Sequence, residues 1–112
     1  DWKTLRKHNH DLIVEGRKLL LKALGAEAPC PENMLGSLAT VQLPIPFKAP
    51  ESNFNYIHPF WQKLMNEYHI QTPVFGWSRT NPRWWLRIAV QAYNSIEQVQ
   101  YLAEVLKKEF PQ

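Results

Sequence analysis

Cysteine is almost absent from this sequence of 112 residues, which contains only Cys30. An internal disulfide is therefore excluded, and a reducing compartment such as the cytoplasm is expected. No apolar run is long enough to cross a membrane, and no basic and then apolar leader opens the chain, so the sequence predicts neither a membrane-spanning nor a secreted protein. The chain begins at Asp1 inside a helical pattern, without a methionine, which indicates a piece of a larger protein.

Clustered ligands and glycine-rich loops are also missing. The four glycines form no phosphate-binding loop, so no cofactor-binding residue is predicted. His8 and His10 would point to different sides of a helix, which argues against a metal site there. Cys30, between Pro29 and Pro31, has neither a base nor a helix N-terminus nearby in the sequence. It is therefore predicted to be a structural thiol, and no catalytic residue is predicted in this chain.

The composition that remains is that of one globular domain. Hydrophobic residues make up 45% of the chain and include five tryptophans, which argues against disorder. A chain of this length buries roughly two-thirds of its unfolded surface. The net charge of +3 permits an acidic partner without requiring nucleic acid.

Hydrophobic spacing predicts six helices and strands. They are a helix at 2–24 capped by Gly25, a strand at 37–43, a helix at 56–68, a strand at 70–77, a strand at 84–94 and a final helix opened by the capping box Ser95-Ile96-Glu97-Gln98. Loops are expected at 26–35 and 47–55, and a hairpin turn at 78–83. The role of the 47–55 loop stays open. The order α-β-α-β-β-α predicts an α+β fold, a three-stranded and mostly antiparallel sheet with helices packed on one face.

The strand at 84–94 presents two different faces. Its apolar face, predicted to lie against the helices, carries Trp84, Leu86, Ile88, Val90 and Ala92. The opposite face carries Trp85, Arg87, Ala89, Gln91 and Tyr93. The planar fork of an arginine suits a carboxylate or a phosphate. Arg87 therefore either binds an anion or points at water.

A family resemblance rests on this strand and on two earlier segments. The spacing from Arg87 to Tyr93-Asn94, followed by Ser95-Ile96-Glu97 at the start of a helix, resembles the last strand and last helix of class V aminotransferase-family enzymes. Two more segments resemble isopenicillin N epimerase-like proteins of that family: Pro29-Cys30-Pro31-Glu32-Asn33-Met34-Leu35-Gly36-Ser37, and the opening Asn9-His10 with Gly16-Arg17-Lys18-Leu19-Leu20. The resemblance covers nearly the whole chain, which corresponds to only the small C-terminal domain of such an enzyme.

The resemblance implies a pyridoxal-phosphate-dependent parent enzyme that acts on amino acids and forms a homodimer. Residues 1–112 would be its small domain, and the missing large domain would hold the cofactor and be the partner of this chain. Arg87 would bind the α-carboxylate of the amino-acid substrate. The fragment alone would be inactive and bind no pyridoxal phosphate, because no lysine here matches the cofactor-binding lysine.

The sequence departs from one branch of this family. Cysteine desulfurases carry a cysteine in the loop before this strand and a serine two residues after the arginine. Here residues 75–83 contain no cysteine, and Ala89 occupies the serine position. These departures argue against desulfuration and leave epimerase, lyase or transferase chemistry open.

Two binding functions are the alternatives. Arg79, Arg83 and Arg87, interleaved with Trp77, Trp84 and Trp85, could contact phosphates and stack on bases. Ten acidic residues along the chain and the lack of an aromatic strand motif argue against a nucleic-acid partner. A protein-interaction domain would use an exposed face with Trp85 and Tyr93.

Overall fold

The computed structural model describes residues 1–47, 57–77 and 80–112. Its elements are α1 (Trp2–Leu24), a short 3-10 helix η1 (Glu32–Met34), β1 (Leu38–Gln42), α2 (Phe60–Tyr68), β2 (Val74–Trp77), β3 (Arg83–Ala89) and α3 (Ile96–Glu109). The predicted α+β fold and its order of helices and strands are confirmed. Arg79 and residues 48–56, including most of the predicted 47–55 loop, lie outside the described residues.

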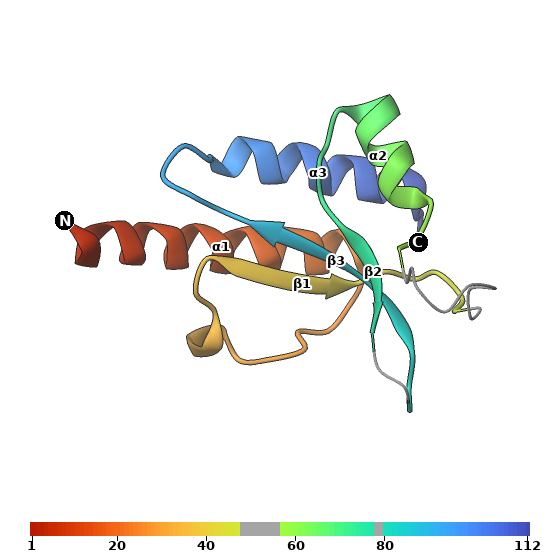
Figure 1. Ribbon diagram of the computed structural model, residues 1–112, viewed down its shortest axis with the longest axis horizontal. Helices are drawn as coiled ribbons and strands as arrows, with labels where there is room; N and C mark the ends of the chain where they lie inside the picture. Colours follow the sequence, from red (N-terminus) through yellow and green to blue (C-terminus); the bar gives the residue numbers. More distant parts are fainter. Residues whose placement is uncertain (48–56, 78–79) are drawn as a thin grey trace.

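The sheet has the strand order β1-β3-β2, and both strand pairs are antiparallel. The strand predicted at 84–94 corresponds to β3, the middle strand, and it forms the expected hairpin with β2. The helices α1 and α3 pack side by side behind the sheet, with α2 beside the C-terminal half of α3 (Figure 1). This arrangement leaves the other face of the sheet uncovered by the described helices.

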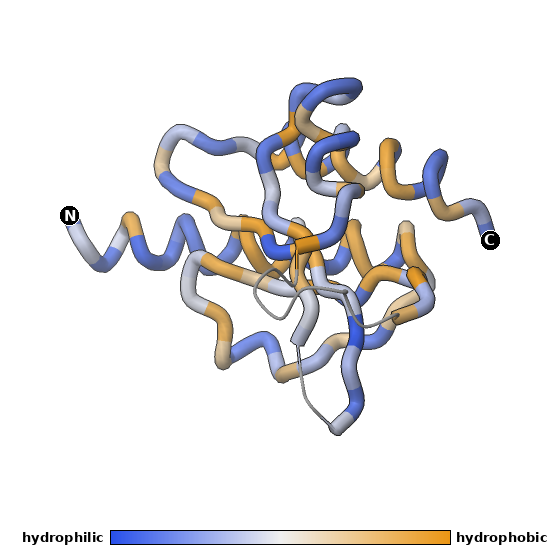
Figure 2. The backbone as a smooth tube through the Cα atoms, turned by 45° about the vertical axis from the view of Figure 1, so that its right-hand side comes forward, coloured by the Kyte–Doolittle hydropathy of each residue, from blue (hydrophilic) through white to orange (hydrophobic). Residues whose placement is uncertain are grey.

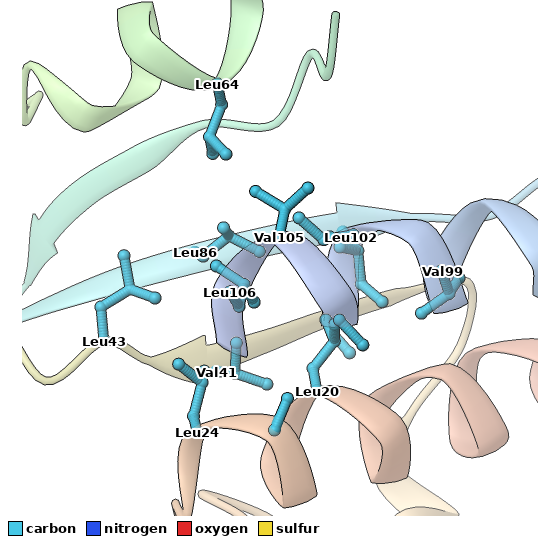
Figure 3. Packing of buried hydrophobic residues seen from close by; sticks show 14 of the residues in the cluster. Leu20, Leu24, Val41, Leu43, Leu64, Leu86, Val99, Leu102, Val105 and Leu106 are labelled. Carbon is cyan, nitrogen blue, oxygen red and sulfur yellow. The ribbon is translucent and has the colours of Figure 1, made fainter. Parts of the chain in front are cut away.

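The core lies between the sheet and the helices α1 and α3. In β3, Leu86 is fully buried and pairs with Val41 of β1 on one side and Val74 of β2 on the other. Leu20 of α1 and Leu106 of α3, both without exposed area, approach the same region (Figure 3). Along α1 the hydropathy of successive residues alternates in short stretches, as expected of a helix with one buried face (Figure 2).

The two long helices are fixed by local features of the sequence. The Asp1 side chain accepts a hydrogen bond from the Lys3 amide at the start of α1. Gly25 ends the helix with a φ of 62°, a left-handed conformation that glycine adopts at little cost. Gly16 permits a close approach of α1 to α3, since a Cβ there would lie 3.2 Å from Val99 Cγ1.

The central strand is shorter than the sequence predicts. It ends at Ala89, and Val90 is still buried, but Gln91, Ala92 and Tyr93 are exposed. The prediction of a strand to residue 94, with Ala92 in the core, is therefore wrong. The reason is a turn, in which the Asn94 side chain accepts a hydrogen bond from the Gln91 amide at 2.8 Å and the Asn94 amide donates to the Gln91 carbonyl.

The start of α2 and the start of β2 also lie later than predicted. The His58 amide donates to the Val74 carbonyl, and Ile57 forms an isolated bridge with Phe75. Residues 57 and 58 are therefore tied to β2 and cannot be helical, and α2 begins at Phe60 after Pro59. Residues 70–73, predicted as strand, precede β2, and their last member is a proline, which has no amide to donate to a sheet.

Candidate functional site

The uncovered face of the sheet carries the candidate site. The outward positions of β3 alternate with its buried ones, as predicted, and place Arg83, Trp85, Arg87 and Ala89 on this face. Thr40 of β1 pairs with Arg87, and Phe75 of β2 pairs with Trp85. Arg87 therefore sits on the middle strand, at an outward position of the sheet face that α1 and α3 do not cover.

The Arg87 guanidinium is exposed and carries an unpaired charge. Within the described ranges it has no hydrogen-bond or ion-pair partner. Its backbone is held by the strand and by a hydrogen bond from the Arg87 amide to the Pro73 carbonyl at 3.2 Å. A fixed backbone with a free guanidinium is suited to binding an anion that arrives from outside this chain.

Arg87 lines a hollow of about 640 Å³. The walls come from the segment before β2, the end of β3 and the first half of α3. Its polar lining includes Thr72, whose Oγ1 is shielded from solvent and has no hydrogen-bond partner in the described structure, and also Gln71 and Gln98. The hollow therefore combines the Arg87 guanidinium with several neutral hydrogen-bonding groups, and Glu97, in the first turn of α3, adds a carboxylate to the same lining.

Asn94, the other residue of the resembling motif, lines the same hollow and shapes it. Its Nδ2 donates to Gln98 Oε1 at 2.9 Å, while that oxygen also accepts from the Ser95 amide at 3.1 Å. The predicted capping box is thus confirmed. Asn94 has its side chain engaged at both ends, so it acts by fixing the turn between β3 and α3.

The alternative sites meet physical objections. Trp84 is only 5% exposed and packs against Phe47 and His58, so it is not available to stack on a base. Tyr93 is exposed but lies in the turn, not on the strand with Trp85.

His10 contacts the Leu35 carbonyl through Nδ1 at 2.9 Å. In the part of the chain that the structure describes, no three His, Cys, Asp or Glu side chains gather as metal ligands would, and no helix is long and apolar enough to cross a membrane.

Cys30 has a neighbour that its local sequence does not reveal. Arg17 of α1 is buried, and its Nη1 donates to the Cys30 carbonyl at 2.8 Å and lies 3.4 Å from Cys30 Sγ. The sequence signals the burial of Arg17, which falls between Ile13 and Leu20 at helical spacing on the apolar face of α1, but it does not signal the contact with Cys30. Cys30 thus contacts a helix that packs on the covered face of the sheet, on the side opposite to Arg87.

The described residues do not by themselves fit pyridoxal phosphate. That cofactor needs a lysine and a phosphate-binding loop, and no lysine lines the hollow at Arg87. Lys7, Lys18, Lys63 and Lys107 lie on helices, with exposed side chains that pair with carboxylates. For an anionic group, the described part of this face offers the Arg87 guanidinium at the hollow, while Arg83 of the same strand donates to the Pro82 carbonyl.

Comparison with known proteins gives one distant relative. No protein-family model matches the sequence. The chain is 28% identical over 108 residues to the probable L-cysteine desulfhydrase, chloroplastic, of Arabidopsis thaliana. The match covers 91% of this chain and 22% of the relative, so the chain spans about a fifth of the length of the curated protein it matches.

The similarity is to the C-terminal part of that plant protein. It supports the coarser half of the family resemblance, a distant relation to class V aminotransferase-like pyridoxal-phosphate enzymes. The comparison gives no support for isopenicillin N epimerase in particular. It relates the chain to an enzyme without testing whether these 112 residues are active or which of them bind a substrate.

Proposed function

We propose that residues 1–112 form the C-terminal, substrate-closing domain of a pyridoxal-phosphate-dependent enzyme that acts on amino acids. In this proposal Arg87 binds the α-carboxylate of the substrate. The large domain of the same protein supplies the cofactor site and faces the open side of the sheet. The observation that carries the proposal is the unpaired, exposed Arg87 guanidinium on that side, at the edge of a hollow.

The geometry of β3 supports this role for Arg87. A substrate must be held in one orientation for a single bond at its Cα to react, and a bidentate arginine–carboxylate pair provides such an orientation. The pair is effective only if the arginine backbone is fixed, and Arg87 lies in the middle strand between Thr40 and Pro73. Closure of a second domain over this face would exclude water and strengthen the charge-assisted hydrogen bonds.

The substrate that we place first is L-cysteine, because the name of the plant relative specifies it. Residues 75–83 offer no thiol beside Arg87, and Cys30 contacts α1 on the other side of the sheet. The proposal therefore favours a reaction of cysteine that uses no protein thiol from this chain. Epimerisation of an amino acid, to which the sequence resemblance points, is the second candidate and places the same demand on Arg87.

The test uses the full-length protein supplied with pyridoxal phosphate. Sulfide release from L-cysteine is measured, and chiral chromatography follows inversion of amino acids. Arg87→Ala should lower kcat/KM by roughly 10-fold to 100-fold, since hydrogen bonds to charged groups contribute about 1.5–3 kcal/mol. Arg87→Lys should recover only part of this loss, because a point charge cannot form the bidentate pair.

Arg83→Ala is the matched control. Arg83 is exposed on the same face of β3, but its Nη1 donates to the Pro82 carbonyl, and it does not line the hollow. Its loss should leave kcat/KM unchanged. An Arg87→Ala enzyme with normal turnover, or an equal loss in both variants, would refute the role of Arg87 as the carboxylate-binding residue.

A further inference from the structure

Arg17 is a buried cation without a carboxylate partner. It is 3% exposed, and in the described ranges it forms no ion pair with an aspartate or glutamate. A charge removed from water costs free energy unless another charge or a set of hydrogen bonds compensates it. The surroundings of the guanidinium should therefore contain a group that can become negative.

The group in that position is the thiol of Cys30. Arg17 Nη1 lies 3.4 Å from Cys30 Sγ and also donates to the Cys30 carbonyl, which fixes the sulfur beside the cation. The Arg17 Nε–H is buried and has no acceptor in the described structure. The nearby charges of Lys18 and Glu32 pair with each other at 3.2 Å on the surface. Arg17 thus places a full charge beside the sulfur through Nη1, and the same guanidinium carries one buried donor, Nε–H, without a partner in the described structure.

We propose that Cys30 is a site of reversible oxidation by hydroperoxides, with Arg17 stabilising first the thiolate and then the sulfenate. This inference does not rest on the proposed function, since Arg17 and Cys30 lie on the other side of the sheet from Arg87. It assigns a chemical role to a thiol that the local sequence predicts to be only structural.

The reaction needs one hydroperoxide molecule as the oxidant. The thiol gives its proton to water, and the thiolate sulfur attacks one peroxide oxygen, so that an S–O bond forms while the O–O bond breaks. The sulfur loses two electrons, which reduce the peroxide. The leaving oxygen takes up a proton and departs as water or an alcohol. The new sulfenate oxygen, attached to the sulfur, adds a negatively charged acceptor beside the Arg17 guanidinium.

The loop around Cys30 admits a small oxidant and holds the sulfur in place. Cys30 is half-buried and is not shielded by a disulfide. Pro29 and Pro31 restrict φ on both sides of it, and the following residues form η1, which begins at Glu32. The sulfur is therefore held against Arg17 in a residue that is only partly buried.

The experiment measures thiol loss with hydrogen peroxide on the purified chain, and dimedone trapping of sulfenate detected by mass spectrometry. The chain has one cysteine, so each signal reports on Cys30 alone. A synthetic peptide of residues 26–36 provides the same local sequence without Arg17. We expect the folded chain to react at least about tenfold faster than the peptide and to form the dimedone adduct, because the charge on sulfur is stabilised by a buried cation.

Two variants of α1 isolate the contribution of Arg17. Arg17→Met removes the guanidinium at similar volume and should lower the rate to that of the peptide. Lys18→Met, the matched control, removes the neighbouring exposed charge and should leave the rate unchanged. A folded wild-type chain that reacts no faster than the peptide, or without a dimedone adduct, overturns the proposal even if Arg17→Met does not fold. So does an equal loss of rate in both variants.

Discussion

Leu86 and Arg87 are neighbours in β3 that should differ sharply in their effect on stability. Leu86 has no exposed area and lies between Val41 and Val74, which are also fully buried. Arg87 points to the uncovered face and has no partner in the described structure. The alternation of a strand therefore separates a residue that holds the core from one that is free to serve a ligand.

The expected magnitudes follow from this difference in surroundings. Leu86→Ala should lower the free energy of unfolding by about 2–5 kcal/mol, since neighbours on both adjacent strands limit collapse of the cavity. For a chain of this size that loss corresponds to a decrease in Tm of roughly 10–20 °C. Arg87→Ala removes an exposed charge with no contact and should stay within about 0.5 kcal/mol, or roughly 2 °C.

Urea unfolding followed by tryptophan fluorescence, together with thermal melts by circular dichroism, measures both values on the 112-residue chain. Equal m-values would indicate that only the stability of the native state changed. An Arg87→Ala variant destabilised by more than about 1.5 kcal/mol would mean that the guanidinium is part of the folded structure, contrary to its free state here. A Leu86→Ala variant that loses less than about 1 kcal/mol would contradict the packing of the core.

Two further predictions concern pH. Burial lowers the pKa of His58 below its ordinary value of 6.5, so the unfolded chain binds a proton at His58 more readily than the folded chain does. The free energy of unfolding should therefore decrease as the pH falls through about 6.5. Urea unfolding between about pH 7.5 and 5.5 should show a smaller decrease in His58→Asn than in the wild type. Hydrogen bonds from the Tyr68 hydroxyl and from Lys63 lower the pKa of Glu109 below 4.5, so its contribution is present above that pH and is lost as the pH falls further. Melts over the acid range should show this loss in wild type and not in Glu109→Gln, and identical acid profiles for the two proteins would exclude the coupling.

The order of elements could be predicted from the sequence because it depends on local patterns. The helix at 2–24 and its Gly25 cap follow from spacing and from the φ that glycine permits. The end of β3 could not be predicted from alternation, because the apolar pattern continues to Ala92. The strand ends because the Gln91 amide donates to the Asn94 side chain and not to a neighbouring strand. Apolar spacing does not show this competition between a turn and the hydrogen bonds of the sheet.

The candidate site could also be predicted from the sequence only in part. Arg87 could be placed on the open face from its position among the apolar residues of β3, since a strand has a period of two. The hollow beside it depends on the path of residues 70–73 and on α3, which meet only in the folded chain. The contact of Arg17 with Cys30 joins a helix to a separate loop, so a search for cations near Cys30 in the sequence alone could not identify it.

The close approach of Gly16 to Val99 has a consequence for how the chain is made. This contact joins the first of the described helices to the last. During synthesis α1 and the sheet therefore leave the ribosome before α3, and their apolar faces stay uncovered until α3 is made. Contacts between such distant segments also require closure of a long loop before they stabilise anything, which slows folding. A nascent chain that stops before Val99 would expose the hydrophobic face of the sheet to chaperones and proteases, and arrival of α3 is the event that converts it to a protected fold.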